Sequence, residues 1–245
     1  SMEQHCPSCG ADLPPEERPS ACPVCGADLQ PEEGEEIPFD NPGRLGFFRS
    51  LWQTWREATF TPNAFFPRIP TSAAVTWPLL YAVLFGWLQA LANVLIQQPM
   101  LRASRATLPP QLRNMAEAFQ TTPEAVAMQF ILEPFIIVVV ILLSSAVFHA
   151  ILYLLNGARP EFVITVRTVS YTAGAYAAYF IPVLGPLLYV IGVLTLLIIG
   201  LARAHQTEGW RSALAVLLPA VACCGAMGML MLFTAAFLLR ATNVM

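Results

Sequence analysis

Apolar residues form several long stretches in this chain, and the longest runs from Val163 to Ala202. A single charged side chain, Arg167, occurs within these forty residues. At about 1.5 Å of rise per residue, the stretch is too long for one helical crossing of a hydrocarbon core of roughly 30 Å and suits two. Two prolines and a glycine within Ile181–Pro186 disfavour a straight helix. The pattern predicts a membrane-buried helical hairpin with arms over 163–180 and 183–203.

The two arms of this hairpin differ in composition. In the first arm, Ser170, Gly174 and Ala178 recur every four residues and form a stripe of small side chains, which lets helices in lipid approach closely. The same arm carries threonine and tyrosine hydroxyls that need hydrogen-bond partners in a dry environment. We expect this arm to be enclosed by other helices and the plainer second arm, with Leu196 and Leu197, to face lipid. Packing alone explains the first arm, and a polar cavity around its tyrosines is the alternative.

Three further apolar stretches predict membrane spans, and with the hairpin they bring the expected total to five. They cover roughly residues 73–96, 130–155 and 214–239. Between the first two lies a more polar segment, 97–129. It contains a helix-start signal, Thr122-Pro123-Glu124, and predicts one or two short amphipathic helices on the membrane surface.

Composition supports an all-α, polytopic membrane protein. Hydrophobic residues make up 56% of the 245 residues and charged residues only 12%. The charge is divided unevenly. Residues 1–40 hold ten acidic residues against one arginine, whereas the remainder holds six acidic residues against twelve arginines. An acidic soluble head therefore precedes a mildly basic membrane body. We expect the membrane body to contact the lipid bilayer, and we expect the chain to bind no nucleic acid.

Two Cys-x-x-Cys pairs lie near the N-terminus, in CPSCG and CPVCG. Four thiolates at this spacing can bind one tetrahedral Zn²⁺, which leaves no open position for a substrate, so the metal is expected to be structural. The alternative is a pair of disulfides in an oxidising compartment. About twenty residues cannot build a sufficient hydrophobic core, so the metal would supply the folding free energy. The predicted ligands are Cys6, Cys9, Cys22 and Cys25.

The segment after the head separates it from the membrane. Residues 31–43 are acidic and rich in proline and glycine, which is typical of a mobile linker. Residues 44–60 then place Leu45, Phe48, Trp52 and Trp55 on one face of an amphipathic helix. Such a helix suits the headgroup region of a membrane, and packing against the protein's own cytosolic face is the alternative. The expected organisation is therefore a zinc-ribbon head (3–30), a linker (31–43) and a five-helix membrane domain (44–245).

Arginines near the ends of the spans predict the orientation. With the head inside the cell, eight arginines lie on the inner side and four on the outer side. This bias favours a cytosolic N-terminus, and five spans then place the C-terminus outside.

Few groups inside the spans could carry chemistry. His149 and Arg167 are the ionisable candidates, whereas Glu133 and Glu161 lie at span boundaries. We interpret His149 as a neutral histidine hydrogen-bonded to a neighbouring helix, and Arg167 as a side chain that reaches the cytosolic interface, where Glu161 can pair with it. We recognise no enzyme in this set and expect no catalytic residues.

Short motifs recur across residues 45–220. They include Trp55-Arg-Glu, Thr61-Pro62, Phe65-Phe66, Glu133-Pro134-Phe135, Leu154-Leu-Asn-Gly157, Pro182 with Gly185, and Gly200-Leu-Ala-Arg-Ala-His205. Together they resemble the Yip1 family of membrane proteins, in its bacterial form. The resemblance implies five membrane helices and a cytosolic N-terminus. Eukaryotic members are associated with vesicle traffic and Rab-type GTPases, partners that cannot be carried over to a prokaryotic chain.

Three functions fit these observations. The first is a non-enzymatic adaptor or organiser of the bacterial inner membrane, whose zinc-ribbon head binds an unidentified cytosolic protein. The second is a small transporter or channel with a polar path along the third membrane helix, and a homo-oligomer is one form it can take. The third is a lipid-handling or membrane-shaping protein that acts through the helix at 44–60.

The zinc assignment gives the first prediction. Metal analysis of the protein purified without added zinc should find about one equivalent of Zn²⁺ per chain, because four thiolates complete one tetrahedral site. Two disulfides found by mass spectrometry, with no zinc, would refute both the metal site and the cytosolic location of the head.

Overall fold

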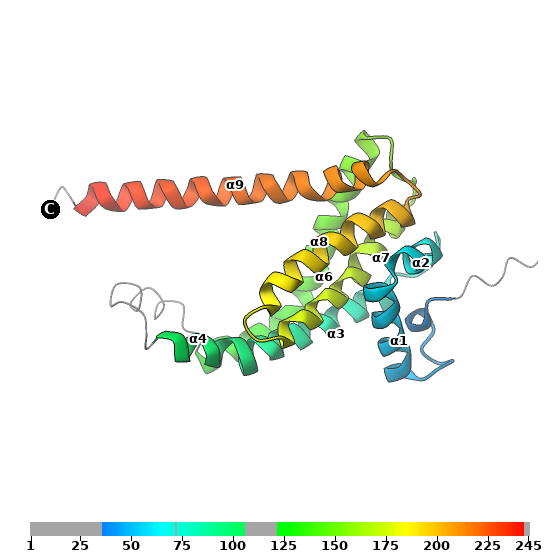
Figure 1. Cartoon of the computed structure of the whole chain (residues 1–245), viewed down its shortest axis with the longest axis horizontal. Coiled ribbons are helices and arrows are strands. Elements are labelled where there is room, and N and C mark those ends of the chain that lie inside the picture. Colours follow the sequence, from blue (N-terminus) through cyan, green and yellow to red (C-terminus); the bar gives the residue numbers. More distant parts are fainter. Residues whose placement is uncertain (1–35, 72, 106–121, 243–245) are drawn as a thin grey trace, which may run out of the picture.

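The computed structural model describes residues 36–71, 73–105 and 122–242, and in this part the chain is helical without any strand (Figure 1). The four cysteines predicted to bind zinc lie outside the described residues. The helices are η1 (Pro38–Asp40), α1 (Phe47–Phe60), α2 (Pro62–Phe65), η2 (Phe66–Arg68), α3 (Thr76–Ala92), η3 (Asn93–Gln97), α4 (Gln98–Arg105), α6 (Pro123–Leu154), α7 (Phe162–Thr172), η4 (Ala173–Phe180), α8 (Gly185–Ala204) and α9 (Gly209–Thr242).

Four helical segments of the described chain are long and apolar enough to cross a membrane. The predicted spans at 73–96, 130–155 and 214–239 each overlap one of them, and the second hairpin arm is the fourth. The remaining predicted arm, 163–180, forms α7 followed by the 3₁₀ helix η4, and so it does not count as one long α-helix. The four segments are Thr76–Met100, Glu124–Leu154, Gly185–Ala204 and Gly209–Met229.

The predicted hairpin is present. The chain reverses over 181–184, and η4 packs alongside α8 (Figure 1). Within the reversal the Gly185 backbone N–H donates to the carbonyl of Ile181 at 2.9 Å. A Cβ on Gly185 would lie 2.6 Å from the carbonyl oxygen of Ala178, so close backbone approach, rather than an unusual φ, requires glycine here. Val183 carries the unusual φ instead, at 64°.

The first arm is enclosed by other helices over 164–175, as predicted, whereas Phe180 at its end is 40% exposed. All residues from Ile164 to Thr172 are buried, and the arm packs against α3, α6 and α8. Three of its hydroxyls find their partners within the arm itself. Thr168, Ser170 and Thr172 each donate to a carbonyl of their own helix at 2.7 Å. Burial among helices therefore does not force these three side chains to bond across helices, because a hydroxyl can reach back one turn.

The expectation for the second arm was wrong at two positions. Leu196 and Leu197 are buried, because the C-terminal half of α8 contacts α7 and α9 as well as η2. The large apolar side chains of α8 that remain exposed lie nearer its start, at Leu187, Leu188, Val190 and Ile191.

The helix predicted to begin at Thr122 is longer than expected. Thr122 caps it, since its hydroxyl accepts a hydrogen bond from the backbone N–H of Ala125 at 3.3 Å. The helix then continues through Pro134 to Leu154 without a separate surface helix. Its 32 residues extend about 48 Å, well beyond a hydrocarbon core of roughly 30 Å.

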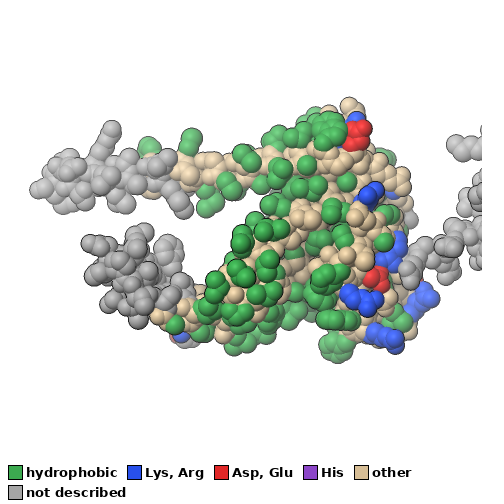
Figure 2. All heavy atoms as spheres, in the orientation of Figure 1, with side chains coloured by type: hydrophobic (Ala, Val, Ile, Leu, Met, Phe, Trp, Pro, Cys, Tyr) green, Lys and Arg blue, Asp and Glu red, His purple; other side chains and the backbone are tan. Residues whose placement is uncertain are grey.

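Charged and apolar side chains separate along the bundle. Most arginines visible in Figure 2 gather at the end where α1 and α2 lie, and apolar side chains cover the flanks. At this end Arg203, at the end of α8, donates to the Asn63 side chain of α2 at 2.9 Å. Arg211, at the start of α9, donates to the carbonyl of Asn156, just after α6, at 2.7 Å. These contacts bring the arginine-bearing helix ends to one face of the membrane body, which we call the α1 face.

The amphipathic helix α1 turns its aromatic side outward. Its buried residues are small, Ser50, Thr54 and Ala58, and recur every four positions. Phe48 is 83% exposed and Trp52 is 62% exposed. Large apolar side chains left uncovered at the edge of an apolar bundle are typical of a helix lying in the headgroup region.

The stripe of small residues gives the second prediction. A Cβ on Gly174 would lie 2.5 Å from the Tyr81 hydroxyl and 3.0 Å from the Trp55 ring, so Gly174→Ala should force α1, η4 and α3 apart. Overpacking of this kind costs about 1–3 kcal/mol of unfolding free energy.

Gly192→Ala is the matched control, because its added Cβ would meet only Ala175, at 3.6 Å. Thermal unfolding in detergent should show a lower Tm for Gly174→Ala and little change for Gly192→Ala. Equal melting of the two variants would contradict the close packing of η4.

Candidate functional site

The most buried charge of the described chain lies on α7. Arg167 is a long polar side chain in a bundle of apolar helices, yet it is only 1% exposed. Its guanidinium donates to a carboxylate oxygen of Asp40 and to the backbone carbonyl of Ala74. A buried cation needs such partners, because the cost of removing it from water is otherwise several kcal/mol.

Asp40 receives a second donor from the same helix. The Tyr171 hydroxyl, one turn after Arg167, donates to the other carboxylate oxygen at 2.5 Å. Burial raises the pKa of Asp40, whereas the Tyr171 hydrogen bond and the Arg167 charge lower it. Two charge-assisted donors fixed on one helical face hold the carboxylate, and with it the whole of η1.

The residues beside Asp40 also pack into the membrane body. Ile37 and Phe39 are buried, and the Phe39 ring contacts the rings of Phe47, Trp77 and Tyr81 edge-on at 5.4–5.9 Å. The backbone N–H of Phe39 donates to the Thr54 hydroxyl at 3.0 Å. The interpretation of 31–43 as a mobile linker was therefore wrong for residues 37–40. Proline and acid content suggested a solvated segment, but one aromatic and one carboxylate anchor it.

The expectation for Arg167 was wrong as well. The side chain does not reach an exposed interface, and its ion-pair partner is Asp40, whereas Glu161 remains exposed at the start of α7. The pairing joins residues 127 positions apart, so no local pattern could reveal it. The only signal was that a buried arginine requires an acid, and the spans themselves offered none.

A second polar group lies under the α1 face and contains two histidines. The Arg159 backbone N–H can only donate, so His205 accepts at Nδ1, at 3.0 Å. Neutral His205 then carries its proton on Nε2 and donates to the Thr165 hydroxyl at 3.0 Å. Thr165 in turn donates to Nδ1 of His149 at 2.8 Å. This confirms the interpretation of His149 as hydrogen-bonded to a neighbouring helix, here α7.

His205 stood out in the sequence only as the end of a family motif, not as a candidate site residue, although it closes this chain of hydrogen bonds. It lies directly after α8, is 4% exposed, and joins α8 to α7 and to the loop before α7. Burial lowers its pKa to about 4, and the nearby His149 and Arg159 add to that effect. The chain Arg159–His205–Thr165–His149 therefore fastens three segments with neutral groups.

The two groups together form what we call the anchor site, built from Asp40, Arg167, Tyr171, Thr165, His149 and His205. Its donors and acceptors are directed at one another. The arrangement is suited to fastening the N-terminal segment and the helix ends to one another. Within the part of the chain that the structure describes, no cluster of three or more metal-ligating side chains occurs.

Comparison with known protein families shows which family this chain belongs to. The Yip1 domain matches residues 57–232, well over half of the chain. The chain belongs to the Yip1 family. Together with the four apolar helices, this identifies an integral membrane protein. Comparison with curated proteins and with solved structures gives no match. The Yip1 match begins inside α1, so Asp40 lies upstream of it while Arg167 and Tyr171 lie within it.

The ion pair gives the third prediction. Asp40→Asn leaves the buried Arg167 guanidinium without its counter-charge, and breaking a buried pair costs about 3–5 kcal/mol. The Tm in detergent should fall clearly. Glu36→Gln is the control, since Glu36 and its partner Arg44 are 49% and 63% exposed and such a pair contributes about 0–1 kcal/mol. If Asp40→Asn melts like the parent, η1 is not anchored by this pair.

His205 gives the fourth prediction, on pH. Its folded-state pKa of about 4 lies below the ordinary value of 6.5, so its contribution is complete above pH 6.5 and is lost as pH falls towards 4. The full loss is on the order of 3 kcal/mol. His205→Asn keeps an acceptor for Arg159 and does not titrate, so the fall of Tm between pH 7 and pH 4.5 should be smaller in this variant. Parallel pH profiles for the two proteins would exclude His205 as the titrating group.

Proposed function

We propose that this Yip1-family protein is a non-enzymatic adaptor of the bacterial inner membrane. In this proposal a zinc-ribbon head, with Zn²⁺ bound by Cys6, Cys9, Cys22 and Cys25, binds a cytosolic protein, and the membrane body anchors the complex. The observation that carries the proposal is the anchor site. Asp40 and Phe39 tie the segment that follows the head to the membrane body, so the head is held a few residues from a fixed point on the α1 face.

The orientation and the number of crossings belong to the same proposal. The segment α7–η4 would be the fifth crossing, because eleven α-helical and eight 3₁₀ residues together extend about 32 Å. In this proposal the α1 face and the N-terminus lie in the cytosol, which the arginines gathered on that face support, and the C-terminus lies outside.

The polar groups of the membrane body support an anchoring role over a catalytic one. Arg167 and His149, the ionisable side chains noted in the sequence, both make internal hydrogen bonds. Of the buried hydroxyls on the first hairpin arm, Thr165 and Tyr171 belong to the anchor site, whereas Thr168, Ser170 and Thr172 bond carbonyls of their own helix. These groups are therefore occupied with one another, which also weighs against the transporter alternative.

One observation favours the membrane-shaping alternative. The exposed aromatic side of α1 would insert among lipid headgroups on one leaflet only, and asymmetric insertion of helices can bend a bilayer. This alternative uses the α1 face on lipid, whereas the adaptor uses it to position the head.

The experiment compares the full chain with two variants. The adaptor predicts that a specific protein co-purifies with the parent, is lost with Cys22→Ser/Cys25→Ser, and is retained with Phe48→Ser/Trp52→Ser. Membrane shaping predicts liposome deformation by the parent that disappears with Phe48→Ser/Trp52→Ser and persists in the cysteine variant. Solute flux in liposomes, with neither of these results, would replace both proposals by transport.

A further inference from the structure

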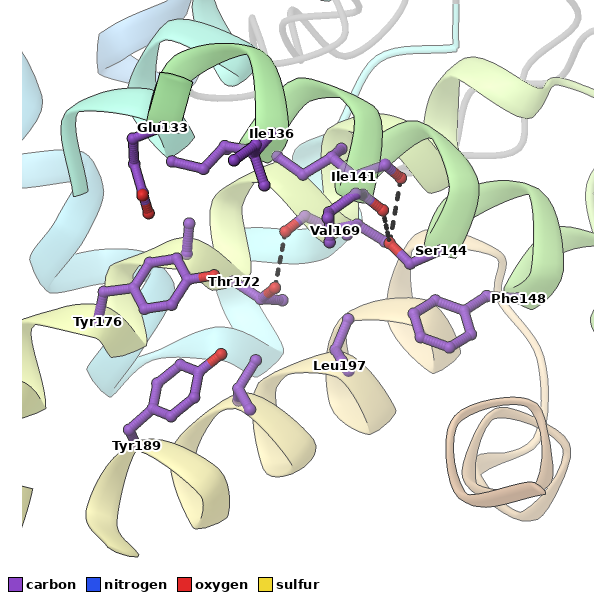
Figure 3. Close-up of a pocket in the computed structure, with 14 residues that line it drawn as sticks. Glu133, Ile136, Ile141, Ser144, Phe148, Val169, Thr172, Tyr176, Tyr189 and Leu197 are labelled. Carbon is purple, nitrogen blue, oxygen red and sulfur yellow. Dashed lines mark hydrogen bonds between the residues drawn. The ribbon is translucent and has the colours of Figure 1, made fainter. Parts of the chain in front are cut away.

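A pocket of about 240 Å³ opens between α6, the first hairpin arm and α8 (Figure 3). Polar groups gather at one end of it. Figure 3 shows the Glu133 carboxylate pointing towards the side of Tyr176, with the hydroxyls of Tyr176 and Tyr189 directed into the pocket. The remaining wall is mainly apolar and includes Ile137, Val140, Ile141, Phe148, Val193 and Leu197.

Glu133 has no cationic partner among the residues that the structure describes, although it is partly buried. Counted back from the end of α6 at Leu154, a hydrocarbon core of roughly 30 Å takes up about 20 residues. Glu133 therefore lies at the edge of that core, on the side away from the α1 face. Trp87 fixes this part of α6, since its ring N–H donates to the carbonyl of Phe130 at 3.2 Å. A carboxylate held at the depth of lipid headgroups attracts a cation.

The two tyrosines add a second feature that suits a cation. Their rings stack with centroids 5.0 Å apart and planes 12° apart. The stacked faces cover each other, so the hydroxyl oxygens are what the two rings present to the pocket, and these can accept hydrogen bonds from an ammonium group. A carboxylate beside two hydroxyl acceptors therefore matches an ammonium group rather than an anion.

The pocket continues into an apolar groove. This groove, of about 390 Å³, shares Val140, Ser144, Phe148 and Leu197 with the pocket and runs on between α6, α8 and α9, towards Val216 and Pro219. A polar end and an apolar trough in one continuous depression have the pattern of an amphiphile. The polar end fits its headgroup, and the trough, which opens on the lipid-facing side, fits its hydrocarbon chain.

We propose that this depression binds an amphiphile that ends in an ammonium group. The ammonium group lies between Glu133, Tyr176 and Tyr189, and the alkyl chain lies along the groove. Either the ethanolamine headgroup of a membrane lipid or a free long-chain amine supplies this chemistry. The site is independent of the anchor site and of the proposed adaptor function.

The test uses the full chain in detergent with two probes, dodecylamine and dodecanol. Dodecylamine, protonated at pH 7, should raise the Tm of the parent in a saturable way, whereas dodecanol should not. Glu133→Gln keeps the shape but removes the charge, and it should weaken dodecylamine binding about tenfold. Glu124→Gln, an exposed carboxylate on the same helix, should bind like the parent.

A second variant tests the site independently, in case Glu133→Gln fails to fold. Val193→Phe fills the apolar wall without touching the charge, and it should weaken the amine as well. Native mass spectrometry with equal amounts of phosphatidylethanolamine and phosphatidylglycerol distinguishes the source. Retained phosphatidylethanolamine that dodecylamine displaces indicates the lipid, and binding of dodecylamine alone indicates a free amine. Equal binding of amine and alcohol, or unchanged amine binding in both Glu133→Gln and Val193→Phe, would overturn the proposal.

Discussion

A guanidinium buried among membrane helices cannot remain without an anion, and this requirement organises the membrane body. Arg167 lies in the centre of the packed region, on the helix that every other long helix except α9 approaches. Its carboxylate comes from a segment that precedes all the predicted spans. The ion pair therefore holds η1 against the bundle, and Phe39 packs among aromatic rings between α1 and α3. The side chains on the buried face of α1 must be small, because η1 and the Phe39 ring pack beside them.

The two histidines also show how the structure limits buried charge. Both remain neutral because a backbone donor fixes the tautomer of His205, and the hydrogen bonds then follow one direction through Thr165 to His149. Within the anchor site, charge is thus confined to the pair of Arg167 and Asp40, while the histidine group joins the helix ends with neutral side chains. Near a membrane, neutral groups avoid the desolvation that charged ones would suffer.

Much of the fold could be predicted from the sequence because lipid leaves few choices. Long apolar stretches, prolines at Ile181–Pro186 and the small stripe at Gly174 indicated the hairpin and its enclosed arm. The partner of Arg167 could not be predicted, because Asp40 lies in a segment whose composition resembles a linker and pairs across 127 positions. His205 lies just beyond an apolar stretch, and its decisive partner is a backbone N–H, which no side-chain pattern reveals. The zinc ligands remain a prediction, since they lie outside the described residues.

The 3₁₀ winding of η4 has a consequence for how this arm can vary. With three residues per turn, positions three apart lie in one column, so Tyr176 and Tyr179 both reach the ring of Tyr189, at 5.0 Å and 5.1 Å. An α-helical arm would turn the two tyrosines about 60° apart. One inserted or deleted residue would rotate everything beyond it by about 120° and empty one side of this three-ring cluster. Insertions and deletions in η4 are therefore tolerable only in multiples of three residues. This constraint acts on the length of the segment and not on the identity of any one residue.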